Sequence, residues 1–178
     1  VPAISTSLIV ATDNCVGLVS VTHLSDIVTP GSCPNKFSIR RTYRATDLCG
    51  NHSDFLQIIT VDDHIKPIIA CSGNMSATTD PGKDYATITV ISPTFGDNCG
   101  IAIISNNFNH SADASGQYPI GTTNVVWTAT DNCGNSSSCT QVITVTDNEK
   151  PIIHCPDDII SCMASVHITP PTATDNSG

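Results

Sequence analysis

The sequence predicts an all-β protein made of tandem sandwich repeats with disulfides. Three observations predict this fold class: long segments recur at one fixed offset, Val, Ile and Thr dominate the apolar and semi-apolar positions, and nine cysteines occur in 178 residues. β-Branched side chains fit a pleated, half-buried surface. No segment keeps the i, i+3, i+4, i+7 apolar spacing of an amphipathic helix, so we expect almost no helix.

Internal repetition sets the domain organisation. Three pairs of segments match at an offset of 84 residues: ATDNC (11–15) with FGDNC (95–99), TYRATDLCGN (42–51) with VWTATDNCGN (126–135), and QIITVDDHIKPIIAC (57–71) with QVITVTDNEKPIIHC (141–155). A further partial copy, TATDNSG, lies at the end of the sequence. We therefore predict a repeat over 1–65 that lacks its first strand, a complete repeat over 66–149, and the beginning of a third repeat over 150–178.

Short strands separated by turn residues make up each repeat. Alternation over 124–130 directs three side chains inward, namely Val125, Trp127 and Ala129. The turn DNCGN at 131–135 leads into a second strand at 140–146, whose apolar positions are Val142 or Ile143, and Val145. Trp127, and Tyr43 at the equivalent position one repeat earlier, are expected to anchor the two cores.

Composition excludes several classes of function. The net charge is −9 with only seven Lys and Arg residues, so the basic stripe of a nucleic-acid-binding protein is missing. No apolar run is long enough for a membrane-spanning helix, and we expect no membrane insertion of this segment. Disulfides belong to oxidising compartments, which favours a secreted or cell-surface location. No signal peptide is visible at Val1, so we expect the segment to derive from a longer precursor.

The sequence does not indicate an enzyme. Six histidines occur, but they accompany no nucleophile-elbow motif such as G-x-S-x-G. They also do not recur as histidines at the 84-residue offset, where His64, for example, aligns with Asn148. We interpret the histidines as solvated loop residues.

The motifs YPIGTTNVVWTATDNCGN and CTQVITVTDNEKPII resemble the hyalin repeat (HYR) family. The segment TPGSCPNKFSIRRTYRATDLCGN is similar to a variant found in very large bacterial surface adhesins, including those of gliding bacteria. The resemblance covers essentially the whole chain. It implies an immunoglobulin-like or fibronectin-III-like sandwich, a role in adhesion or extracellular scaffolding, and no catalytic residues.

The implied fold narrows the cysteine pairing, which sequence alone does not fix. In an immunoglobulin-like sandwich the B–C and F–G loops meet at one end, and the same 34-residue spacing recurs in both repeats. We therefore expect the disulfides Cys15–Cys49 and Cys99–Cys133, and a third between strands A and G, Cys71–Cys139. The natural partner of Cys33 would be a cysteine of a first strand that this segment lacks. Partners of Cys155 and Cys162 stay open, and a zinc site of His154, Cys155 and Cys162 matches no compact zinc pattern.

Acidic residues gather where the repeats join, in VDDHIKP (61–67) and VTDNEKP (145–151). Oxygen ligands in such groups suit Ca²⁺, which takes six to eight of them. The predicted calcium ligands at these inter-repeat junctions are Asp62, Asp63, Asp97, Asp131, Asp147, Asn148, Glu149 and Asp175. The alternative is that Asp and Asn serve only hydrogen bonding within turns.

Four N-x-S sequons, at Asn51, Asn74, Asn109 and Asn135, could carry glycans in a eukaryotic secretory host. Two functions remain open. The first is a structural spacer or adhesive module whose partners are the neighbouring repeats of the same long chain or filament. The second is a loop-based ligand-binding module for a surface glycan or protein, for which 105–118 is the only loop large enough.

Overall fold

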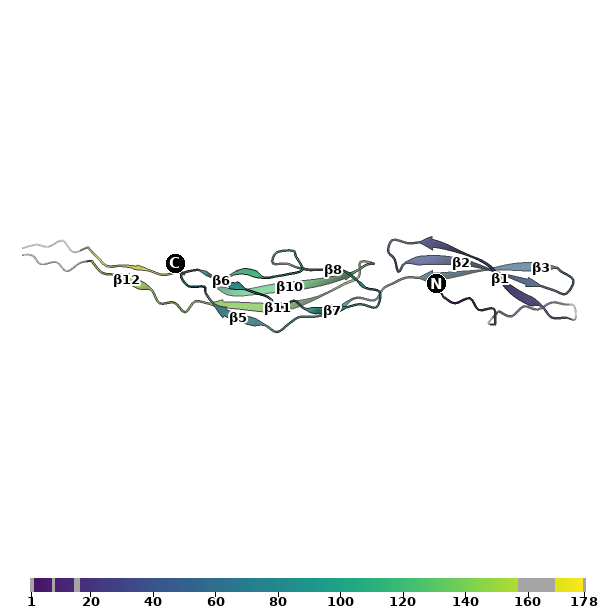
Figure 1. Ribbon diagram of the computed structural model, residues 1–178, viewed down its shortest axis with the longest axis horizontal. Coiled ribbons are helices and arrows are strands. Elements are labelled where there is room, and N and C mark those ends of the chain that lie inside the picture. The colour runs from purple at the N-terminus through teal and green to yellow at the C-terminus, as the bar shows by residue number, and fades with distance from the viewer. Residues whose placement is uncertain (1, 8, 15–16, 157–168, 178) are drawn as a thin grey trace, which may run out of the picture. The chain divides into compact units, whose positions relative to one another are not determined.

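The computed structural model describes residues 2–7, 9–14, 17–156 and 169–177 (Figure 1). Within these ranges all regular structure is β-strand, as the sequence predicts. No helix there has the length and apolar character needed to cross a membrane. The chain divides into two compact units.

The first unit comprises Val1–Lys66 together with Asp97–Ala102 and Thr130–Asn135. Its antiparallel sheet has three strands in chain order: β1 (Ser20–Pro30), β2 (Phe37–Thr46) and β3 (His52–Val61). Alternate residues of the central strand are buried, because successive side chains of a strand point to opposite faces. These residues are Ile39, Arg41 and Tyr43.

Arg41 is a charged residue within that buried row. Its guanidinium donates two hydrogen bonds to the Asp26 carboxylate, with Nε–Oδ1 and Nη2–Oδ2 distances of 2.8 Å each. The remaining donors reach the carbonyl oxygens of Pro2 and Ala3 at 2.9 and 3.1 Å. Burial of the cation is therefore compensated by four hydrogen bonds, as a buried charge requires.

The second unit comprises Pro67–Gly96, Ile103–Ala129 and Ser136–Gly178. One sheet has the order β5-β11-β10-β8, with β5 parallel to β11. Its strands are β5 (Met75–Thr78), β8 (Ile101–Asn106), β10 (Gly121–Asp131) and β11 (Ser136–Thr146). The long β10 and β11 strands lie side by side in Figure 1.

Three shorter antiparallel pairs complete the described strands. They are β4 (Ile68–Ala70) with β7 (Thr94–Gly96), β6 (Tyr85–Ile88) with β9 (Gly116–Pro119), and β12 (Ile152–His154) with β13 (Thr172–Thr174). Side chains from β6 and β9 pack against those of β10 and β11 in one core, which makes the unit a β-sandwich. The core residues are Ala86, Ile88, Val90, Ala114, Tyr118, Val125, Trp127, Ile143 and Val145.

The predicted inward row is confirmed, since Val125, Trp127 and Ala129 are fully buried. Of the two candidates for the inward position in the following strand, Val142 and Ile143, Ile143 is the fully buried one. Trp127 donates its indole Nε1–H to the Gln141 side-chain oxygen at 3.3 Å, so its polar atom is satisfied inside the core.

Candidate cation site beside a disulfide

The repeated D-x-C-G-N turn fixes the carboxylate of Asp131. Oδ1 accepts the backbone N–H groups of Cys133 and Asn135 at 2.8 Å each, and Oδ2 accepts Asn135 Nδ2 at 2.7 Å. Gly134 adopts φ +92°, a left-handed conformation that glycine tolerates best. The sequence therefore holds this side chain in place through local hydrogen bonds.

Asp63 and Asp97 each leave one carboxylate oxygen uncommitted. Oδ1 of Asp63 accepts the Ile65 N–H at 3.1 Å, and Oδ1 of Asp97 accepts the Cys99 N–H at 2.8 Å. The Oδ2 atoms of both residues are buried and have no hydrogen-bond partner among the described residues. Asp63 is only 7% exposed, so its free oxygen is shielded from solvent.

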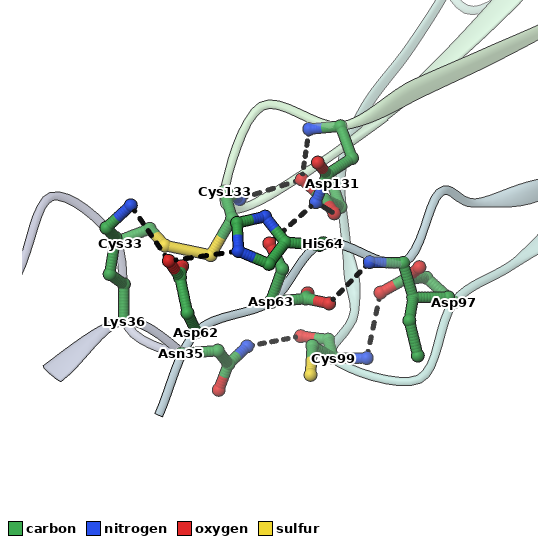
Figure 2. The surroundings of a disulfide bond; sticks show 12 residues. Cys33, Asn35, Lys36, Asp62, Asp63, His64, Asp97, Cys99, Asp131 and Cys133 are labelled. Carbon is green, nitrogen blue, oxygen red and sulfur yellow. Dashed lines mark hydrogen bonds and ion pairs between the residues drawn. A yellow bond between two sulfur atoms is a disulfide. The ribbon is translucent and has the colours of Figure 1, made fainter. Parts of the chain in front are cut away.

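The three carboxylates converge within the first unit (Figure 2). One oxygen from each of Asp63, Asp97 and Asp131 lies within 4.8 Å of the other two. No Lys or Arg of the described residues forms an ion pair with any of the three. Like charges at this distance repel, and a buried oxygen without a partner is costly. The arrangement offers hard oxygen ligands to a cation.

Asp62, the other acidic residue expected here, has different partners. Its carboxylate oxygen lies 3.2 Å from Lys36 Nζ and 3.2 Å from His64 Nε2. The two neighbouring side chains therefore have different partners, and only Asp63 joins the cluster. Lys36 was not identified from the sequence as a junction residue.

The disulfide next to the cluster corrects the predicted pairing of Cys99 with Cys133. Cys133 bonds instead to Cys33, 100 residues earlier, with a Cα–Cα distance of 5.1 Å (Figure 2). The partner expected for Cys33, on a missing first strand, is therefore also wrong. The physical reason lies in the turn after β1, where Asn35 Nδ2 donates to the Cys99 carbonyl oxygen at 3.1 Å. This turn brings Cys33 to the loop that contains Cys133.

Cys99 remains a thiol at the same place. Burial raises the pKa of this thiol, and the neighbouring Asp63 carboxylate raises it further. Asn98 Nδ2 lies 3.0 Å from its sulfur. Cys99 is thus held protonated beside the acidic cluster.

The other cysteine predictions have mixed outcomes. The Cys71–Cys139 disulfide is present, with a Cα–Cα distance of 5.7 Å. Cys15 lies outside the described residues, so Cys15–Cys49 stays a prediction, and Cys162 also lies outside them. Cys155 forms no disulfide with any described residue.

The second acidic junction has a different arrangement. Asp147 Oδ1 accepts the Glu149 N–H at 2.9 Å and contacts the Thr79 hydroxyl at 3.3 Å. The Glu149 carboxylate accepts the Gly82 N–H at 2.9 Å. Asp175 accepts the N–H of Asn176 at 2.7 Å. Asn148 is exposed. Within the described part of the chain, these residues form no three-carboxylate group like the first.

The sequence offered one signal that we missed. Asp13 and Asp47 precede Asp97 and Asp131 by the same 84-residue offset. Both line a cavity of about 210 Å³ in the first unit. The Asp47 turn repeats that of Asp131, with Asn51 Nδ2 donating to Oδ2 at 2.8 Å.

The long loop at 105–118 uses its polar and aromatic groups internally. Asn106 is buried, and its side chain accepts the N–H of Phe108 at 2.8 Å and donates to the Ser111 carbonyl at 2.8 Å. The Phe108 ring stacks on Tyr118 with a centroid distance of 4.2 Å. The loop therefore presents no free aromatic platform built from these two rings.

Comparison with known proteins gives a consistent result. The HYR domain family matches residues 62–145. Hyalin from Strongylocentrotus purpuratus is 29% identical over 170 residues, which covers 86% of this chain and 14% of that protein. Hyalin from Lytechinus variegatus is 31% identical over 148 residues, covering 77% of this chain and 27% of the relative.

A third similar protein is not a hyalin. The rat sushi, von Willebrand factor type A, EGF and pentraxin domain-containing protein 1 (Rattus norvegicus) is 32% identical over 134 residues. The match covers 72% of this chain but only 4% of that protein. The chain thus spans a small part of the length of each relative.

Proposed function

Residues 62–145 of this chain belong to the HYR domain family, and on that premise we propose that the chain is a structural and adhesive spacer segment of a longer extracellular protein. We further propose that Asp63, Asp97 and Asp131 bind a Ca²⁺ ion that stiffens it. Two disulfides support an oxidising location. The proposed repeat boundaries are those of the sequence: 1–65, 66–149 and 150–178.

The observation that carries the cation site is the buried, unpartnered Oδ2 of Asp63. A native protein rarely leaves a buried carboxylate oxygen unsatisfied. One oxygen of the same carboxylate lies within 4.8 Å of one oxygen of Asp97 and one of Asp131. A divalent cation satisfies the free oxygens of Asp63 and Asp97 at once and removes the repulsion among the three groups.

The ligand chemistry favours calcium. The three side chains are carboxylates, and Ca²⁺ accepts six to eight oxygens in flexible geometry, with water completing the shell. Asp147, Asn148, Glu149 and Asp175 stay predicted ligands for a second junction.

Calorimetry and thermal unfolding with calcium test the site. We expect one ion to bind through this cluster, and calcium at one hundred times its dissociation constant to add about 2.7 kcal/mol to the free energy of unfolding. Asp63→Asn and Asp97→Asn should each weaken binding at least tenfold. Asp131 is left intact, because its carboxylate also holds the turn together.

Asp62→Asn is the matched control, since it removes the adjacent charge but no cluster oxygen. It should bind calcium as the parent protein does. Equal losses in Asp62→Asn and Asp63→Asn, or no calcium-dependent shift in the parent, would show that the cluster is no cation site. Small-angle scattering with calcium and with a chelator then tests the spacer role, for which we expect a more flexible chain after chelation.

A further inference from the structure

The sheet of the first unit has one buried face and one outer face, and the outer face carries exposed apolar side chains and arginines. Five residues share it, here called the isoleucine–arginine face: Ile27, Arg40, Arg44, Leu56 and Ile58. The strand register aligns Ile27, Arg40 and Ile58 in one row across the three strands. Ile27, Leu56 and Ile58 are 60%, 43% and 66% exposed.

The fold itself does not require all of these residues. At the 84-residue offset, Leu56 corresponds to the polar Thr140, whereas Ile58 corresponds to Val142, which is also apolar. Arg40 and Arg44 likewise correspond to Asn124 and Thr128, which carry no charge. Among the inner positions, Ile59 corresponds to Ile143, but the buried Arg41 corresponds to the buried Val125. The positive charge of the outer face is therefore specific to the first repeat.

Arg40 is the free cation of this face. Arg44 is bound to Asp54 at 2.7 Å and Arg41 to Asp26 at 2.8 Å. Arg40 is exposed and forms no ion pair with any described residue. An arginine between two exposed isoleucines has the composition of an interface centre, where Arg is enriched and apolar residues exclude water.

Charge indicates the partner. Five of the seven Lys and Arg residues, Lys36, Arg40, Arg41, Arg44 and Lys66, precede residue 67, whereas ten of the sixteen Asp and Glu residues follow it. We propose that the isoleucine–arginine face binds the acidic region, residues 67–178, of a second copy of this chain. A contact between two different surfaces of identical chains is heterologous and propagates into open arrays. This inference does not rest on the cation site.

Sedimentation velocity in a chelating buffer tests the proposal independently of calcium. We expect self-association at low salt, weakening with ionic strength as exposed charge contacts do. Arg40→Glu should weaken it at least tenfold, and Ile58→Thr should weaken it as well. Lys66→Glu makes the same charge change at an exposed position that lies outside both the face and residues 67–178, so it should associate like the parent protein.

A mixing experiment distinguishes a heterologous contact from a symmetric one. Labelled Arg40→Glu protein keeps its acidic region, so it should still sediment with the parent chain although it does not associate with itself. A monomeric parent chain at low salt would overturn the proposal. So would association unchanged in Arg40→Glu, an equal loss in Lys66→Glu, or failure of the labelled variant to join the parent.

Discussion

Trp127 and Gln141 form a hydrogen-bonded pair in the middle of the second unit, with both side chains fully buried. The amide nitrogen of Gln141 also donates to the Gly73 carbonyl at 3.0 Å. The pair thus links two adjacent long strands to the segment before β5.

Gln141→Leu should destabilise the second unit by about 2 kcal/mol, because it leaves the indole N–H buried without a partner. Urea unfolding followed by fluorescence measures this directly, since Trp127 is the only tryptophan. Gln57→Leu is the control. It changes the equivalent residue of the first repeat, which is exposed, and should shift stability by less than about 0.5 kcal/mol.

Acid should weaken the first unit through Asp26. Hydrogen bonds from Arg41, and then from His23, hold the pKa of its carboxyl well below the usual range. As pH falls, the Asp26 carboxylate is therefore protonated in the unfolded chain before it is protonated in the folded protein. The stabilisation that this carboxylate gives the folded protein is present above about pH 4, and it is lost as pH falls towards the lower pKa of the folded state. Melting temperatures at about pH 3 and about pH 7 should differ less in Asp26→Asn than in the parent. An equal acid loss in both proteins would contradict this explanation.

Peptide mapping without reduction should recover Cys33–Cys133 and Cys71–Cys139, with Cys99 open to alkylation. In Cys33→Ser the released Cys133 should pair with Cys99, since the two loops lie in one compact unit. Removing Cys71 and Cys139 together should lower the free energy of unfolding by about 4 kcal/mol. Without the bond, the unfolded chain is no longer constrained by a closed loop of that length and gains conformational entropy. Recovery of Cys99–Cys133 from the parent protein would contradict this pairing.

Glycosylation in a eukaryotic secretory host should differ among the four sequons. The Asn74 amide nitrogen is unbonded among the described residues, while its oxygen accepts the Val142 N–H at 3.0 Å. Asn135 uses both amide hydrogens, donating to Asp131 at 2.7 Å and to the Asp63 carbonyl at 3.0 Å. A glycan replaces one of these hydrogens. Glycopeptide mass spectrometry should find Asn74 occupied and Asn135 bare in folded protein, and the reverse pattern would refute the argument.

The fold could be predicted from the sequence because buried positions produce a periodic pattern of apolar residues. Trp127 and its buried neighbours Val125 and Ala129 alternate with half-buried residues, and the 84-residue offset transfers that pattern to Tyr43. The choice of disulfide partner produces no such pattern in the sequence. The equal spacing of Cys15–Cys49 and Cys99–Cys133 indicates equivalent positions, but the turn carrying Cys33 decides which sulfur meets Cys133.

Choosing between Asp62 and Asp63 likewise requires the direction of each side chain. Both residues belong to one acidic motif, yet one meets Lys36 and the other the acidic cluster. Their 84-residue counterparts are Thr146 and Asp147, so the offset pointed towards Asp63. Neither composition nor spacing reports the buried, unpartnered oxygen that distinguishes the site.

The Cys33–Cys133 bond also governs how the chain responds to pulling. A force applied at the two ends passes from residue 33 to residue 133 through the sulfur bridge. Residues 34–132 therefore bear no load. At about 3.4 Å per extended residue, this segment corresponds to roughly 340 Å of contour length. The Cys71–Cys139 bond spans part of the same segment, so force spectroscopy should release the whole length only after both disulfides are reduced. The extensibility of a chain containing this segment therefore depends on the thiol chemistry around it.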